Sequence, residues 1–389
     1  MPLMTFPAEE DFAPITESGP LADELRERIA ASGPMTFRDF MEAALYHPRF
    51  GYYTTHANAM TRGGDYVTSP EVHPIFGGLV AKQMIELWEL MGRPARFDLV
   101  EPGGGGGLLA RDILRRATRE PAFAAALRYR IVERSPALVA RQRQTLAEVE
   151  GATDVGWLDA LPEAVEGCVL SNEFFDALPV HRVRREGGVL REVCVTHDGR
   201  RFADAAGPLS TPALAAYFEA LGLLPGDGCV AEVNLDAIDW TERIARALAR
   251  GAVLTFDYGY EAGDLYAPWR RDGTLLCFYR QSASSDPYQR LGRQDITASI
   301  DFTTLRTTGE RAGLRTLGMT DQTQFLLRMG IAEGLASVAR EGSEHVEEYF
   351  ARRNVVLDLI DPGRLGRIKV LLQGRGLPDG PPRGFRDGA

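Results

Sequence analysis

The sequence has fewer basic than acidic residues, few cysteines and no long apolar run. Lys and Arg number 44 against 54 Asp and Glu, so the formal charge is −10 at pH 7, which argues against the phosphate backbone of a nucleic acid as the main ligand. No apolar stretch approaches the roughly 20 residues that a membrane-spanning helix needs, and the acidic stretch 1–12 has no basic region leading into an apolar core. We therefore expect a cytoplasmic protein that binds no nucleic acid and does not insert into a membrane.

Cysteine and histidine are both sparse. None of the four cysteines belongs to a C-x-x-C pair, and none has metal-ligand spacing with one of the six histidines, which predicts reduced thiols and no metal site. The G-x-S-x-G turn of many hydrolases and the lysine-bearing P-loop are also absent. With 389 residues, 44% of them hydrophobic, the chain is long enough for one large domain with additions or for two domains.

The most informative segment is residues 97–107, which read FDLVEPGGGGG. An apolar run ends in Glu101 and passes directly into five glycines, and an amphipathic stretch over 110–116 follows. Glycine suits a backbone that approaches a ligand closely or takes positive φ. A strand that turns through glycines into a helix lies at the edge of a parallel sheet where α/β proteins bind nucleotides. The segment predicts an α/β fold with a mainly parallel, twisted sheet and a nucleotide-like ligand at this turn.

Two cofactors compete for this turn, and a plain structural turn is the third alternative. The dinucleotide fingerprint G-x-G-x-x-G/A fits Gly105, Gly107 and Ala110. The pattern E-x-G-x-G-x-G, which S-adenosylmethionine (SAM) methyltransferases favour, fits Glu101 and the alternate glycines Gly103, Gly105 and Gly107. A carboxylate repels a pyrophosphate but attracts the sulfonium and ammonium groups of SAM, so Glu101 favours SAM.

Two further carboxylates end predicted strands. Glu133 follows an apolar strand over 129–132, and a carboxylate there can accept both ribose hydroxyls in SAM and dinucleotide folds alike. Asp159 ends a third strand and is a candidate for the adenine end of the cofactor, with a helix or turn cap as its alternative role. These positions extend the expected cofactor site along the sheet edge.

A second polar motif, SNEFFDALP at 171–179, also follows a short apolar strand. Its polar groups should therefore lie at the same sheet edge as the glycine turn. If the methyl acceptor is a guanidinium, Glu173 and Asp176 beside Asn172 suit it, because carboxylates can hold a guanidinium through paired hydrogen bonds. The alternative is that Asn172 and Asp176 cap a helix. Asp257 ends another apolar strand and is a further candidate on the acceptor side, or it caps a loop.

A third group of candidates precedes the sheet. Gly64, Asp65, Thr68 and Ser69 combine an acid, hydroxyls and a helix start, and they either fold over the cofactor as a lid or buttress the fold. Ser69 is the expected N-cap of a single helix that runs to about Met91.

We expect five segments along the chain. They are N-terminal helices and a loop that covers the cofactor site (1–68), a cofactor-binding half (69–180), an inserted hairpin and helix (181–230), the rest of the core (231–376) and a disordered tail (377–389). Within the fourth segment, the loop 258–302 is rich in Gly, Tyr, Arg and Asp and is expected on the acceptor side. Asp295 in this loop is a secondary functional candidate.

Short segments along most of the chain match one known family in the same order. They are 40–48, 51–53, 64–71, 76–77, 101–107, 132–136, 172–179, 257–259, 273–275, 295–297, 301–302, 324–326 and 369–370. In these segments the chain resembles the MidA-like SAM-dependent methyltransferases, whose mitochondrial members are assembly factors for respiratory complex I. NEFFDALP at 172–179 is the most specific of them.

The resemblance implies a Rossmann-like class I methyltransferase core, with an N-terminal helical segment and inserted hairpin and helical segments, and SAM as the methyl donor. For the mitochondrial branch it implies methylation of an arginine on a hydrophilic complex I subunit. Carried onto this chain, Glu101, the alternate glycines and Glu133 would bind SAM, while Asn172, Glu173 and Asp176 would lie by the acceptor.

The chain departs from the family pattern in two places. Gly104 and Gly106 stand where the family turn usually has a proline and a bulky, often basic residue, and Gln281 stands where a histidine is usual. The leading hypothesis is a SAM-dependent protein arginine methyltransferase. The alternatives are a non-catalytic assembly factor that keeps a SAM pocket, a methyltransferase of a small molecule, and a nicotinamide-dependent dehydrogenase that uses the shifted glycine frame.

Overall fold

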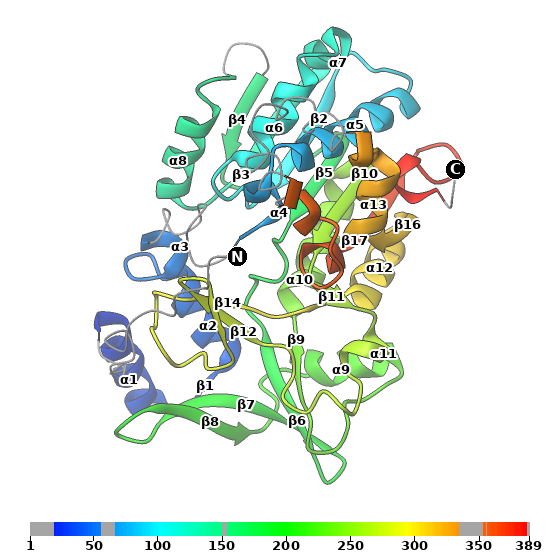
Figure 1. Cartoon of the computed structure of the whole chain (residues 1–389). Coiled ribbons are helices and arrows are strands. Elements are labelled where there is room, and N and C mark those ends of the chain that lie inside the picture. Colours follow the sequence, from blue (N-terminus) through cyan, green and yellow to red (C-terminus); the bar gives the residue numbers. More distant parts are fainter. Residues whose placement is uncertain (1–18, 56–66, 150–153, 334–352, 355, 387–389) are drawn as a thin grey trace.

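A seven-stranded sheet forms the centre of the protein in the computed structural model, which describes residues 19–55, 67–149, 154–333, 353–354 and 356–386 (Figure 1). The strand order is β16-β17-β10-β5-β2-β3-β4. The strands are β2 (Phe97–Pro102), β3 (Leu127–Val132), β4 (Asp154–Leu158), β5 (Val165–Asn172), β10 (Leu248–Asp257), β16 (Arg315–Asp321) and β17 (Lys369–Arg375). Only β17 runs against its neighbours, so the predicted mainly parallel α/β sheet is confirmed.

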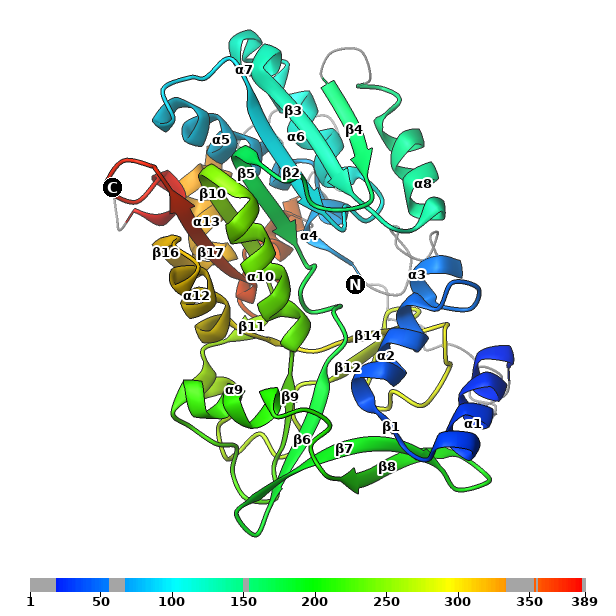
Figure 2. The same ribbon diagram turned by 180° about the vertical axis from the view of Figure 1, so that it is seen from behind.

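Helices cover both faces of this sheet, as Figures 1 and 2 show from opposite sides. One face packs against α5 (Ile75–Leu90), α6 (Leu108–Ala117) and α13 (Gln322–Met329), and the other against α10 (Leu235–Ala247) and α12 (Phe302–Arg311). Because both faces are covered, a central strand needs apolar residues at consecutive positions. All six residues of β2 are buried, and four of them are apolar, the exceptions being Asp98 and Glu101.

The chain reverses its direction of travel across the sheet between β2 and β5. From β2 it moves outward to β3 and β4, and it then returns to β5 on the other side of β2. The loops that leave the carboxyl ends of β2 and β5 therefore diverge, and such a switch point leaves a crevice in which α/β proteins bind ligands. α7 (Pro121–Ala126) and α8 (Pro136–Leu146) flank β3 along the chain.

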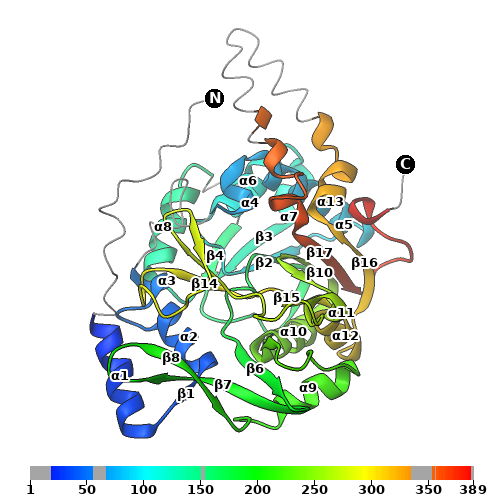
Figure 3. The same ribbon diagram turned by 60° about the horizontal axis from the view of Figure 1, so that its bottom comes forward.

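A second group of elements packs around its own core and covers the carboxyl edge of the sheet. It contains α1 (Pro20–Ser32), α2 (Phe37–Tyr46) and α3 (Tyr52–Thr55), the strands β1 (Met35–Thr36), β6 (His181–Glu186), β7 (Val189–His197) and β8 (Phe202–Gly207), and the strands β12 (Leu276–Tyr279), β13 (Ser282–Ser284) and β14 (Asp295–Thr297). Phe37, Phe40, Val195 and Ile296 are among its fully buried side chains. We call residues 20–55, 180–207 and 275–298 the second lobe; Figure 3 shows its helices α1 and α2 beside β7 and β8.

Shorter elements connect the second lobe to the sheet. They are β9 (Val230–Val233), which pairs with β6, α9 (Ala213–Leu221), β11 (Gly259–Tyr260), α11 (Ala262–Leu265) and β15 (Ile300–Asp301). The hairpin expected within residues 181–230 is present as β7 and β8. No helix within the described ranges is both long and apolar enough to cross a bilayer.

The helix expected from Ser69 to Met91 is in fact two helices. α4 (Ser69–Val72) is capped by Thr68, whose backbone N–H donates to Oε2 of Glu71 at 3.0 Å, so Ser69 is the first helical residue and not the cap. The break follows at His73, which is extended at φ −162° and ψ 142°. Pro74 causes it, because a proline disfavours helical geometry at the residue before it and has no N–H to donate.

The expected disordered tail is also wrong for residues 377–386. Phe385 is 6% exposed and its ring centroid lies 5.7 Å from that of Phe325. The backbone N–H of Gly384 donates to Gln83 on α5, and the short turn η3 (Arg383–Phe385) packs on α13. A single aromatic residue among prolines and glycines therefore anchors this segment, and the composition of the segment concealed it.

We expect the Phe385→Ala substitution to lower the free energy of unfolding by about 3 kcal/mol, because it removes a buried ring and leaves a cavity against Phe325. Chemical denaturation monitored by circular dichroism measures this change. Trp269→Ala is the matched control, since Trp269 is 74% exposed and its truncation should change the unfolding free energy by less than about 0.5 kcal/mol. Equal losses for the two variants would show that residues 377–386 are not part of the core.

Candidate functional site

A pocket lies at the carboxyl ends of β2 and β5. Its wall combines the glycine turn, the start of α4, the loop after β5 and two parts of the second lobe. The lining residues are Tyr52, Tyr53, Thr68, Pro70, Glu71, Glu101, Gly103–Gly106, Leu108, Leu109, Asn172, Glu173, Asp176, Asp295 and Thr297. The pocket thus brings together candidates that are more than 100 residues apart in the sequence.

The glycine turn has positive φ at alternate positions, in step with the alternate glycines of the sequence pattern. Gly103, Gly105 and Gly107 have φ values of +67°, +50° and +80°, which glycine adopts without strain. Gly103 also meets a steric limit, because a Cβ atom there would lie 2.8 Å from the ring of Phe174. The turn and the loop after β5 are therefore in direct contact.

Two side chains from α8 hold the turn. Gln142 Nε2 donates to the carbonyl of Gly105 at 2.9 Å, and Thr145 Oγ1 donates to the carbonyl of Gly106 at 2.7 Å. Gln142 is fully buried and also accepts a hydrogen bond from the indole of Trp157. These bonds order a turn that has glycine at positions 104 and 106. The sequence analysis missed both residues, because a glutamine and a threonine on a surface-like helix carry no motif.

The carboxylate of Glu101 lies beneath the turn and is 3% exposed. It accepts a hydrogen bond from the hydroxyl of Tyr129 at 2.7 Å. Burial raises the pKa of Glu101 to about 7, because the charged form loses hydration. An ammonium or sulfonium group beside this carboxylate would restore its charge.

Glu133 lies next to the turn, although it is not part of the pocket wall. Its Oε1 accepts the backbone N–H of Ser135 at 2.9 Å, and its Oε2 accepts from Nε2 of Gln142 at 3.3 Å. Burial also raises the pKa of Glu133. Gln142 therefore links Glu133 to the glycine turn.

The loop after β5 presents polar groups to the same pocket. Nδ2 of Asn172 donates to Oε1 of Glu173 at 3.0 Å, and the backbone N–H of Ser69 donates to the same oxygen at 3.3 Å. Oδ1 of Asn172 is buried and has no hydrogen-bond partner among the described residues. A buried unpaired acceptor is rare in native proteins, so its presence in a pocket wall suits a donor from a ligand.

Glu173 has an uncommon backbone conformation, with φ of +50°. Non-glycine residues rarely adopt positive φ, and such strain persists only where the surrounding structure enforces it. Asp176, three residues later, is 4% exposed. Burial raises the pKa of Asp176 well above its ordinary range, and the nearby carboxylates of Asp257, Glu173 and Asp295 raise it further.

Asp257 does not reach the pocket and acts as the loop cap that was its alternative role. It is fully buried, and its Oδ2 accepts the backbone N–H groups of Phe174 and Phe175 at 3.2 and 2.9 Å, while Oδ1 accepts that of Tyr258 at 2.8 Å. Burial raises the pKa of Asp257 to about 7. The three N–H donors favour its charged form, so the proton of the Asp176–Asp257 pair resides mainly on Asp176.

The remaining candidates occupy varied positions. Thr68 lines the pocket, whereas Ser69 is fully buried and its Oγ donates to Gln322 at 2.9 Å. Asp159 follows β4 directly and is exposed, outside the pocket wall. Gln281 is exposed in the turn between β12 and β13. Gly64 and Asp65 lie outside the described residues.

The comparisons with known proteins agree on one family. A family model described as S-adenosyl-L-methionine-dependent methyltransferase matches residues 79–320. The mitochondrial protein arginine methyltransferase NDUFAF7 homolog of Drosophila melanogaster is 33% identical over 91% of this chain and 84% of its own length. The corresponding Homo sapiens protein, named protein arginine methyltransferase NDUFAF7, is 31% identical over 84% of this chain and 75% of its own.

Solved structures extend the similarity to almost the whole chain. A Burkholderia thailandensis protein, crystallised with bound S-adenosyl-homocysteine, is 34% identical and covers 99% of this chain and 98% of its own, with a TM-score of 0.87. A second crystal structure from the same organism, in its native form, is also 34% identical and has a TM-score of 0.84.

The different environments of Asp257 and Asp176 lead to opposite effects on stability. We expect Asp257→Ala to lower the free energy of unfolding by roughly 3 kcal/mol, because three backbone N–H groups lose their acceptor. Asp176→Asn should instead raise it, because it removes a buried acid that neighbouring carboxylates oppose.

The Asp176 effect should also depend on pH. A carboxyl group with a raised pKa binds its proton in the folded protein but releases it on unfolding, so stability falls as pH rises above about 4. The stability advantage of Asp176→Asn should therefore grow with pH, by up to about 1.4 kcal/mol per pH unit. Urea denaturation at pH 5, 6 and 7 measures this, and an advantage that does not change with pH would contradict the assignment.

Proposed function

Because the chain belongs to the SAM-dependent methyltransferases, we propose that it transfers the methyl group of SAM to the guanidinium of an arginine in a protein. When bound, SAM supplies an electrophilic methyl group on a sulfonium. The residues present fit SAM: a buried carboxylate for its cationic end, backbone at positive φ for close approach, and no lysine or arginine in the described pocket wall.

Each cofactor residue has a distinct task in this proposal. Glu101 attracts the ammonium of SAM, and Gly103 and Gly105 allow the backbone to pass close to it. Glu133 accepts the ribose hydroxyls. Thr68 contacts the cofactor from the start of α4. These side chains act by binding and orientation, which supply much of the catalysis in an in-line displacement.

Further positions belong to the cofactor side of the proposal with smaller roles. Gly107 ends the turn at the start of α6, and Asp159 stands at the adenine end of the sheet edge. Ser69 supports the site through Gln322, and its backbone N–H orients Glu173. Gly64 and Asp65 stay sequence-based predictions.

The acceptor half is formed by Asn172, Glu173 and Asp176. A guanidinium is planar and always charged, and carboxylates hold it through paired hydrogen bonds. Carboxylates on one side would draw its positive charge toward them and leave a nitrogen on the other side free to attack. Asp176 releases its proton to solvent as the guanidinium arrives, because the cation stabilises the carboxylate in place of the hydration lost on burial. The carboxylate then accepts the proton that the methylated nitrogen releases.

The observation that carries this proposal is the placement of acidic side chains beside the glycine turn. Asp176 and Glu173 share the pocket with the unpaired Oδ1 of Asn172. A guanidinium stabilises the ionised forms of these carboxyl groups, whereas a neutral or anionic acceptor does not. The names of the relatives, which specify protein arginine methylation, support the same acceptor.

The identity of the acceptor protein follows only from the family resemblance. A hydrophilic subunit of respiratory complex I is the first candidate, and a cytoplasmic location stays a prediction. Activity on small metabolites alone would favour the small-molecule alternative, and binding without any transfer would favour the assembly-factor alternative.

The test is transfer of a labelled methyl group from SAM to purified hydrophilic complex I subunits and to an arginine peptide library. Labelled methylarginine in the hydrolysate, identified by mass spectrometry, is the expected product. SAM binding without label on any arginine would overturn the proposed acceptor.

In that assay we expect Asp176→Asn to bind S-adenosyl-homocysteine as the unsubstituted protein does but to lose at least 100-fold in transfer rate, because the amide neither pairs with the guanidinium nor accepts its proton. Calorimetric titration measures the binding. Parallel loss of binding and transfer would make Asp176 a structural residue.

A second expected outcome concerns pH. With its pKa raised to about 7, Glu101 is mostly protonated below that value and gains its charge as pH rises. Affinity for S-adenosyl-homocysteine, which keeps the ammonium, should therefore rise by up to about tenfold per pH unit toward pH 7 and level off above it. Titrations between pH 5.5 and 8 test this. Glu101→Gln keeps the acceptor for Tyr129 and should flatten the profile around pH 7.

A further inference from the structure

The second lobe contributes a third carboxylate to the pocket. Asp295 begins β14, is 7% exposed and lines the same pocket as Asp176 and Glu173. It also helps to raise the pKa of Asp176, which places the two carboxylates within electrostatic reach of each other. Asp295 comes from the second lobe, whereas Asp176 lies on the loop after β5.

A tyrosine of α3 fixes the side chain of Asp295. The hydroxyl of Tyr53 donates to Oδ1 of Asp295 at 2.8 Å, and the backbone N–H of Ile296 donates to the same oxygen at 2.9 Å. The carbonyl of Tyr53 accepts from Oγ of Ser135 at 3.1 Å, and Ser135 is the residue whose N–H binds Glu133. Tyr53 therefore joins the acceptor wall to the cofactor side.

Polar contacts also fix the second lobe to the loop that bears Asp176. The backbone N–H of Ala298 donates to the carbonyl of Asp176 at 3.0 Å, and the hydroxyl of Tyr46 donates to the next carbonyl, that of Ala177, at 2.9 Å. The rings of Tyr46 and Tyr53 are in contact, with centroids 5.2 Å apart. One tyrosine pair thus holds both segments that carry acceptor carboxylates.

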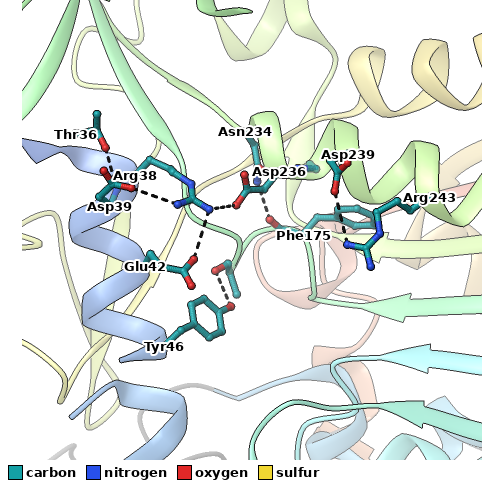
Figure 4. A network of polar contacts seen from close by, with 12 residues as sticks. Thr36, Arg38, Asp39, Glu42, Tyr46, Phe175, Asn234, Asp236, Asp239 and Arg243 are labelled. Carbon is teal, nitrogen blue, oxygen red and sulfur yellow. Dashed lines mark hydrogen bonds and ion pairs between the residues drawn. The ribbon is translucent and has the colours of Figure 1, made fainter. Parts of the chain in front are cut away.

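An ion pair also links the second lobe to α10. Nη2 of Arg38 on α2 lies 2.8 Å from Oδ2 of Asp236 in the first turn of α10 (Figure 4). The neighbouring Asn234 donates to the carbonyl of Phe175 at 2.9 Å, so the start of α10 also holds the loop after β5. In the same view, the Asp239–Arg243 pair stays within α10 and does not cross between the lobes.

We infer that Asp295 is a third acceptor-binding carboxylate, and that Tyr53 and the Arg38–Asp236 ion pair position it opposite Asp176. The inference rests on the proposed function, since it assigns a role within the same site. A guanidinium has five N–H donors directed to different sides, so carboxylates on two walls can contact it at once. A planar cation between Asp295 and Asp176 would have a fixed orientation, which a single carboxylate does not enforce.

The first test measures methyl transfer at saturating SAM to the arginine peptide that the unsubstituted protein modifies fastest. Asp295→Asn should raise the KM for this peptide about tenfold or more, because a hydrogen bond to a charged group is lost. Affinity for S-adenosyl-homocysteine should change less than twofold. Tyr53→Phe, which keeps the ring but not the hydroxyl, should raise the same KM by a smaller factor of about three to ten.

The outcomes separate the inference from the proposed function. If the unsubstituted protein modifies no arginine peptide, the proposed function fails and the inference with it. If it does so and Asp295→Asn keeps an unchanged KM, the inference alone is overturned. A raised KM at unchanged cofactor affinity supports both, since a general loss of folding would lower both affinities.

The ion pair is tested by charge exchange. Arg38→Asp alone should raise the peptide KM several-fold. Combining it with Asp236→Arg should restore part of the loss, because the pair forms again in reverse while position 38 stays beside Asp39 and Glu42. Arg364→Ala is the control: it breaks an equally short ion pair, 2.8 Å from Asp358, that has no contact with the pocket. No rescue in the double variant, or an equal effect of the control, would overturn the positioning role of Arg38.

Discussion

The site depends on one buried carboxylate, that of Asp257, and on the three backbone N–H groups that it accepts. β5 and β10 are parallel neighbours, so the ends of both strands meet at the same edge of the sheet. The carboxylate at the end of β10 draws the N–H groups of Phe174 and Phe175 toward itself, and the chain after β5 must turn sharply to supply them. The turn places Glu173 at a positive φ, which strains its backbone, and it brings the ring of Phe174 against Gly103. Asp257 therefore holds the loop after β5 in place, and through Phe174 this loop contacts the glycine turn.

The same arrangement concentrates negative charge in a buried space. Asp257, Glu173 and Asp295 all oppose ionisation of Asp176, and burial disfavours the ionised forms of both Asp176 and Asp257. A protein that needed only stability would not place these groups together, because each unpaired charge costs free energy in a low dielectric. Such local conflicts occur in native proteins mainly at functional sites, where a ligand resolves them. The relief of this repulsion by a cationic acceptor is then a source of binding selectivity.

The sequence predicted the parts of this site that follow from local periodicity and strand ends. Glu101, Asn172 and Asp176 end or follow apolar runs, so the rule that parallel strands share a carboxyl edge placed them together without a structure. Residues such as Gln142 and Tyr53 could not be found in this way. Their roles arise from contacts between α8 or α3 and distant loops, and no spacing in the sequence encodes such contacts. For Asp257 the sequence left two roles open for a related reason, because a carboxylate at a strand end can face either the pocket or its own backbone. Pro74 and Phe385 show the same limit for the fold. Pro74 breaks a helix that the surrounding pattern predicts to be continuous, and Phe385 anchors a segment whose prolines and glycines predict disorder.

The two halves of the site have different origins in the chain, and this division has a consequence for specificity. The cofactor half lies on consecutive strands of the central sheet, where the glycine turn and Glu133 are fixed by parallel pairing. The acceptor half needs the second lobe, which is assembled from the start of the chain and two later segments that pack around a separate core. Changes in that lobe can move Asp295 without altering β2 or β3, because the lobe packs around its own core. Recognition of the acceptor can thus change while methyl-donor binding is kept, which is how one fold serves different substrates. In the proposed function, the carboxylate geometry across the two lobes, rather than the glycine turn, therefore decides which acceptor the enzyme uses.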